Sequence, residues 1–162
     1  MIPENLVISQ ETVGPWDIVT VHHKPPARSL AVPVINVIGN SVPTSESGKR
    51  RLAEWKRQTA ARTKERRGAD CWNPRLHYAI SIGFSFHMAT HGNQPLDIEN
   101  FLKPSLDALA AGLFCPNDQD PRLIRRYNYD DSNFRHVFIQ RLPDAPRESE
   151  EGAAIYASAV AS

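Results

Sequence analysis

The sequence has few cysteines and no long apolar run. Its two cysteines, Cys71 and Cys115, lack CxxC spacing, which argues against a zinc knuckle and against a disulfide framework. The most apolar stretch near the start, residues 30–39, is short and interrupted by Pro33, so no membrane span is predicted. No charged-then-apolar leader is seen, and a cytoplasmic location is the default expectation.

An excess of charge of one sign is also lacking, because the formal net charge is +1 over 162 residues. A nucleic-acid partner therefore requires a local basic patch rather than a basic body. With 41% hydrophobic and 23% charged residues the composition is that of a globular domain, and the length suffices for one core. We predict a single domain over residues 1–162, with an N-terminal arm over 1–16 and a C-terminal tail over 143–162.

The acidic residues of most interest lie between residues 95 and 120. Asp97 and Glu99 are two apart, so on an extended backbone both carboxylates point to one side. Asp118 comes later, and only a fold that turns the chain back brings it to the other two. Such a cluster is often a solvated surface, but a few carboxylates with water and phosphate oxygens also bind Mg²⁺. Spacing alone leaves both interpretations open.

A helix is predicted directly after the first two acids, over residues 100–111. Apolar residues recur there at helical spacing. Pro104 is tolerated only near a helix N-terminus, which sets the start, and Gly112 is expected to end the helix in a left-handed conformation. Lys103 and Asp107 are four apart and therefore form a pair on the solvent side.

This segment resembles the core motif of the RusA family of Holliday-junction resolvases, Asp-x-Asp-Asn-x-x-Lys-x-x-x-Asp-Ala-Leu followed by an Asp-Asp pair. In the present chain the motif reads Asp97-x-Glu99-Asn100-x-x-Lys103-x-x-x-Asp107-Ala108-Leu109, and then Asn117-Asp118. Two positions depart from the family pattern, because Glu99 and Asn117 each stand where the family has an aspartate.

The resemblance implies an α+β, RusA-like fold with a small mixed β-sheet and two principal helices. It implies that Asp97, Glu99 and Asp118 bind Mg²⁺, with Mn²⁺ as the alternative ion, and that Lys103 is catalytic alongside them. It further implies a homodimer that resolves four-way DNA junctions by paired nicks, in recombination and repair. Two alternatives stay open: a related phosphodiesterase acting on other branched or single-stranded nucleic acid, and a DNA-binding protein weakened in catalysis by Glu99 and Asn117.

A second helix, predicted over residues 46–67, concentrates positive charge. Leu52, Trp55 and Thr59 share one face, and the other face is basic: Lys49, Arg50, Arg51, Lys56, Arg57, Arg62, Lys64, Arg66 and Arg67. A charged face is often merely solvated. Phosphate binding nevertheless gains from concentrated cations, because each contact releases a condensed counterion. Beside a nuclease-like core, we predict DNA contacts through Lys49, Arg50, Lys56 and Arg57.

The remaining segments predict strands. Alternating or β-rich patterns are found over residues 16–23, 31–38, 77–87, 122–129 and 134–142, the last two forming a hairpin. Pairing of 122–129 with 77–87 would return Asp118 to the other acids. His91 is close enough in sequence to reach the acidic loop. Residues 153–162 are expected to form a short docking helix or to be disordered.

Overall fold

A computed structural model describes residues 6–23, 29–35, 46–93, 96–114 and 131–160. Its strands are β1 (Leu6–Val13), β2 (Trp16–His23), β3 (Ser29–Ile35), β4 (Tyr78–Ser85), β5 (Phe134–Arg141) and β6 (Gly152–Ala159). Its helices are α1 (Glu46–Arg67) and α2 (Glu99–Phe114), with short 3₁₀ turns at Met88–His91 and Glu148–Glu150. The predicted α+β class is confirmed.

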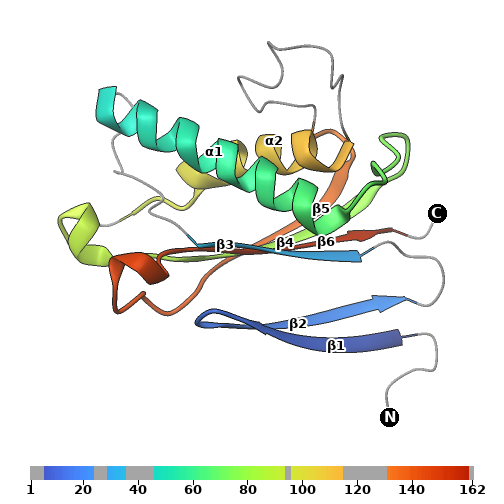
Figure 1. Cartoon of the computed structure of the whole chain (residues 1–162), viewed down its shortest axis with the longest axis horizontal. Coiled ribbons are helices and arrows are strands. Elements are labelled where there is room, and N and C mark those ends of the chain that lie inside the picture. Colours follow the sequence, from blue (N-terminus) through green and yellow to red (C-terminus); the bar gives the residue numbers. More distant parts are fainter. Residues whose placement is uncertain (1–5, 24–28, 36–45, 94–95, 115–130, 161–162) are drawn as a thin grey trace.

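A four-stranded mixed sheet in the order β3-β6-β4-β5 forms the centre of the fold. β6 is antiparallel to both of its neighbours, whereas β4 and β5 are parallel. Helices α1 and α2 cover one face of this sheet, and the β1–β2 hairpin lies beneath the other (Figure 1). Within the described residues, no helix is long and apolar enough to cross a membrane.

The core lies between the sheet and the helices. Side chains alternate along β4, so that Tyr78, Ile80, Ile82 and Phe84 are at most 2% exposed. They pack with apolar residues of α2, including Leu109, into one cluster. Burying each large apolar side chain contributes about 1.5–3 kcal/mol, and this alternation therefore fixes which face of the sheet the helices cover.

The two helices pack against each other very closely at Gly112. A Cβ at this position would lie 2.6 Å from Cβ of Thr63 and 2.8 Å from the carbonyl oxygen of Ala60. The expectation that Gly112 ends the helix is wrong, because α2 continues to Phe114. Glycine is used here for the close approach of α1, rather than for a left-handed backbone.

The C-terminal segment is also different from its prediction. In place of a docking helix or disorder, residues 152–159 form β6, which lies between β3 and β4. Ala153, Ile155 and Ala157 point into the core and are at most 1% exposed. At Gly152 an added Cβ would lie 2.0 Å from the carbonyl oxygen of Val34. Burial between two strands therefore overrides the weak strand preference of alanine.

The N-terminal segment contains more than an arm. β1 pairs with β2 along its whole length, from Leu6 opposite His23 to Val13 opposite Trp16. The two-residue turn consists of Gly14, whose φ is +59°, and Pro15. A positive φ at the first turn residue matches the right-handed twist of a hairpin, so this turn chemistry closes the pair.

Residues 122–129 and Asp118 lie outside the described residues. β4 has β5 along one edge and β6 along the other over nearly its full length. Both edges of β4 are thus taken by described strands, and the suggested pairing partner, 122–129, lies outside the described residues. The expected later strand, 134–142, is present as β5, parallel to β4.

The loop between α1 and β4 is tied to the end of α2. Cys71 is disulfide-bonded, which corrects the expectation that its spacing argues against disulfides. The neighbouring Trp72 is only 4% exposed, and its backbone N–H donates to the carbonyl of Leu113 at 2.8 Å. This loop is thus part of the packed structure.

Candidate functional site

Asp97 and Glu99 lie at the start of α2, and both are exposed. Ile98 between them packs against the core cluster, so the two carboxylates share the solvent side. Oδ1 of Asp97 accepts a hydrogen bond from the backbone N–H of Glu99 at 3.0 Å. Glu99 is the first residue of the helix rather than part of the preceding loop. Asp97 therefore satisfies one of the unpaired donors at the helix start.

Asp97 and Glu99 alone supply only two of the three predicted metal ligands. Among the residues that the structure describes, no three His, Cys, Asp or Glu side chains lie close enough to hold an ion. The third predicted ligand, Asp118, lies outside them. Mg²⁺ usually keeps several waters and is held by one or two carboxylates together with substrate phosphates. Exposed Asp97 and Glu99 fit that kind of site.

Lys103 lies one turn further along α2 and is held by two carboxylates. Its Nζ is 2.7 Å from Oδ1 of Asp107 and 2.8 Å from Oδ2 of Asp131. Desolvation alone would lower the pKa of Lys103, but the hydrogen bonds and charges of Asp107 and Asp131 raise it overall. The ammonium group is thus fixed in position and stays protonated at neutral pH.

Asp131 was not among the predicted site residues, because it falls between 122–129 and 134–142, the two strands expected to form a hairpin. Its backbone does form the turn, because its carbonyl accepts from the N–H of Phe134 at 2.9 Å. Its side chain, however, binds Lys103, which is 28 residues earlier in the sequence. No local pattern signals such a contact, since it depends on how β5 returns beside α2.

The basic helix reaches this site through Lys56. Desolvation lowers the pKa of Lys56, and the nearby positive charge of Lys103 lowers it further, whereas the charge of Asp107 opposes the shift. The ammonium groups of α1 and α2 are therefore close enough to interact. The predicted DNA-contacting helix and the predicted catalytic helix meet at these residues.

The other predicted DNA-binding residues lie further from this contact. Lys49 and Arg50 are exposed near the start of α1. Arg57 forms a bidentate contact with Glu54, in which Nε donates to Oε2 at 2.8 Å and Nη2 donates to Oε1 at 2.6 Å. Hydrogen bonds from Arg57 and Gln58 lower the pKa of Glu54 to about 2. Arg57 is thus partly neutralised by its own helix.

Two further arginines of the basic helix have structural contacts. Nε of Arg67 donates to the carbonyl of Gly112 at 2.6 Å, which satisfies an acceptor near the end of α2. Arg66 pairs with Glu11 of β1 at 2.9 Å. The basic face of α1 is therefore partly used in holding the fold together.

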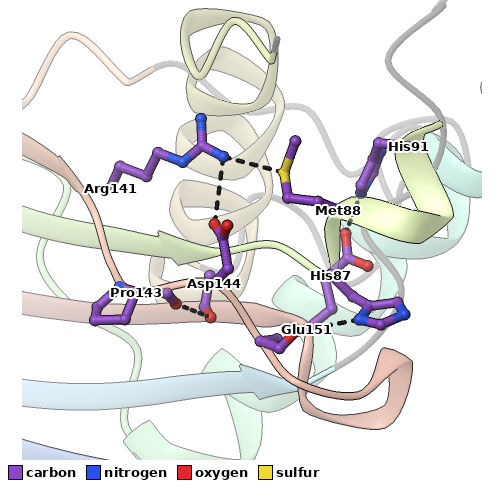
Figure 2. A network of polar contacts seen from close by, with 9 residues as sticks. His87, Met88, His91, Arg141, Pro143, Asp144 and Glu151 are labelled. Carbon is purple, nitrogen blue, oxygen red and sulfur yellow. Dashed lines mark hydrogen bonds and ion pairs between the residues drawn. The ribbon is translucent and has the colours of Figure 1, made fainter. Parts of the chain in front are cut away.

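His91 does not reach the acids, contrary to expectation. Figure 2 shows that it points toward Glu151, whose Oε1 is 2.5 Å from its Nε2. Both side chains are fully buried. The His91 ring also lies edge-on to Phe86 and to Phe101 in the first turn of α2, with centroids 5.6 Å and 6.5 Å apart. The pair supports the start of α2 from within.

No family model, curated protein or solved structure matches this chain.

Proposed function

We propose that this protein is a Mg²⁺-dependent endonuclease of the RusA type, which resolves four-way DNA junctions by paired nicks. The observation that carries the proposal is the packing of the basic helix α1 against α2. There Nε1 of Trp55, which precedes Lys56, donates to Oγ of Ser105, two residues after Lys103, at 2.9 Å. A basic helix, an ordered lysine and exposed acids then lie along one surface. This combination suits a phosphate that is first bound and then attacked.

In this proposal each side chain has a distinct task. Asp97, Glu99 and Asp118 hold the ion, and Lys103 stabilises the charge that develops on the phosphate. When bound, Mg²⁺ would supply an activated water and stabilise the phosphate and the leaving oxygen. Asp107 and Asp131 keep the Lys103 ammonium in place, so that little reorganisation is needed on substrate binding.

A homodimer belongs to the same proposal. A four-way junction presents two equivalent strands, and resolution requires a nick in each. An enzyme with two-fold symmetry offers two equivalent sites for this task. Sedimentation of the chain with and without junction DNA measures this directly.

The test is a nicking assay on junction, flap and linear duplex DNA in Mg²⁺. We expect wild-type protein to nick the junction preferentially and Asp97→Asn to be inactive. In EDTA, Asp97→Asn should bind the junction at least as tightly as wild type, because a carboxylate beside the phosphate is removed. Asp70→Asn, an exposed loop aspartate, is the matched control and should behave as wild type. Full-rate nicking by Asp97→Asn would place the chemistry elsewhere.

The DNA-contacting role of α1 is tested by salt dependence. Replacing Arg50, Lys56 and Arg57 by alanine should flatten the slope of log affinity against log salt by up to about 0.9 per lost phosphate contact. An unchanged slope would show that these residues form only a solvated face.

A catalytically weakened DNA-binding protein is the second candidate. The longer Glu99 at a family aspartate position favours it. Salt-dependent junction binding by wild-type protein, without nicking in Mg²⁺ or Mn²⁺, would select this candidate over the nuclease.

A further inference from the structure

The face of the sheet opposite the helices carries a row of side chains that the proposed nuclease site does not use. In the strand register, Ser81 of β4 lies beside Tyr156 of β6 on one side and Phe138 of β5 on the other. Residues directly opposite across a sheet point to the same face. Since Ile80 and Ile82 point toward the helices, this row points away from them.

Phe138 of this row borders an open hollow. It is 62% exposed, the highest value among the large hydrophobic residues that the structure describes. A hollow of about 550 Å³ is lined by Ser81, Tyr156, Phe138 and their neighbours. The accessible ring and the hollow beside it together offer a surface for a flat ligand.

The floor of the hollow beside Phe138 is small and polar. Across the sheet from Phe138 lies Ser81, whose hydroxyl can hydrogen-bond a base edge. The side chain of Tyr156 hydrogen-bonds Ser29 and Ser158, so Phe138 is the ring on which a base can stack.

The rows on either side of Ser81 also leave room. In the next row, Ala79 lies beside His136 on one side and Ser158 on the other. The side chains of Ala79 and Ser158 are too small to fill the hollow. At the other end, Leu142 lies directly over Gly83, where an added Cβ would come within 2.9 Å of it. The hollow is thus open toward the start of β5 and closed toward its end.

Charge identifies the kind of partner. Among the described residues, the lining of the hollow includes Arg135 and no acidic residue. Nη2 of Arg135 also lies 3.1 Å from Nε2 of His77. The adjoining hollow under the hairpin, which shares Ser81 and Tyr156 with this one, is lined by Asp17, Asp144 and Glu150. An anionic ligand would therefore be held on the β5 side and repelled from the hairpin side.

A second copy of the chain fits this edge less well. β5 is an edge strand, but a two-fold pairing of β5 with itself would bring together Arg135 and Arg141 from both copies. Like charges facing each other across strands are destabilising, and charged side chains commonly prevent such pairing. The same cations attract a polyanion.

We propose that this face binds an unpaired nucleic-acid strand. One base stacks on Phe138 above Ser81, and the adjacent phosphate lies at Arg135. Aromatic residues on an open sheet are a common platform for unpaired bases, since every base has a flat face to stack. The site lies across the sheet from α1 and α2 and does not depend on the nuclease proposal.

The experiment measures binding of fluorescein-labelled ten-nucleotide DNA and RNA strands by anisotropy, in EDTA so that nothing is cleaved. Phe138→Ala should weaken binding about 5-fold to 100-fold, the range expected for one lost stacking contact. Phe138→Trp should retain binding. Val137→Ala is the matched control, because Val137 is also an exposed apolar residue of β5, at 39%, but points to the other face. Comparing the DNA and RNA strands shows which of them the face prefers.

Three results would overturn the proposal. One is a wild-type protein that does not bind these strands. Another is equal binding by Phe138→Ala and Val137→Ala. The third is a wild-type dimer that Phe138→Ala dissociates while strand binding is unchanged, which would assign the face to a second copy. Junction nicking is measured on the same variants, so loss of nicking in Asp97→Asn and loss of strand binding in Phe138→Ala are scored independently.

Discussion

Replacing Gly112 by alanine should destabilise this protein, although alanine is normally the better helix residue. On propensity alone the change would stabilise α2 by about 1 kcal/mol. The added Cβ, however, would lie 2.6 Å from Cβ of Thr63 and 2.8 Å from the carbonyl oxygen of Ala60. The second obstacle is backbone, so α1 itself must move. Overpacking of this kind costs about 1–3 kcal/mol, and we take the upper half of that range.

The expected net loss is therefore about 1–2 kcal/mol in the free energy of unfolding, the difference between these two effects. Urea denaturation measures it, with the fluorescence of Trp55 and Trp72 as the signal, because both are buried, at 1% and 4% exposure. The midpoint should fall while the slope stays constant, as expected when stability alone changes.

A control separates propensity from packing. Ala61 is exposed in α1, so Ala61→Gly should cost about 1 kcal/mol through propensity alone. If Gly112→Ala instead raises the free energy of unfolding by that amount, the helices are not in the close contact described, and the reasoning fails.

Three further predictions concern the charged groups. Glu151→Ala should cost about 1–3 kcal/mol, because a buried nitrogen of His91 loses its hydrogen-bond partner. A Glu151→Leu, His91→Phe double variant should be closer to wild type in urea denaturation. Junction affinity should fall as pH rises toward the usual lysine pKa of about 10.4, because Lys56 has a lowered pKa and loses its charge early. Lys56→Arg should remove this early fall in affinity. A wild-type pH profile identical to that of Lys56→Arg would contradict the assignment. Under single-turnover conditions, Glu99→Asp should nick faster than wild type in Mg²⁺, by up to about a hundredfold. The difference in rate between the two proteins should be smaller in Mn²⁺. Inactivity of Glu99→Asp in both ions would show that the longer glutamate is the fitted ligand.

Elements with a long periodic signal were predictable from sequence. The predicted helix over residues 46–67 coincides with α1, and the predicted strand over 16–23 coincides with β2. In both, the pattern is local and strong. Gly112 shows the limit of such reasoning, because a glycine near the end of a helix is most often a C-terminal residue. Its actual role depends on α1, which is distant in sequence.

The same distinction applies to the site. Lys103 and Asp107 are placed by helical spacing, so their ion pair could be expected from the sequence. The contacts of Lys103 with Asp131, in the turn before β5, and of His91 with Glu151 could not be expected in this way. The two residues are 28 residues apart in the first contact and 60 in the second, and only the tertiary fold brings them together. The strand formed by residues 152–159 was missed for a related reason, since its alanine-rich sequence is favourable only between two other strands.

The position of β6 has a consequence for how the chain is made. β3 and β4 have no direct contact as neighbours in the sheet, since β6 separates them. On the ribosome, β3 would emerge on the order of a hundred residues before β6, a wait of roughly 5–25 s at usual rates of synthesis. During that time two apolar strands have open edges, which are prone to aggregation. Nascent chains that stall before Gly152 should therefore be clients of chaperones, whereas those that extend past Ala159 should be able to close the sheet.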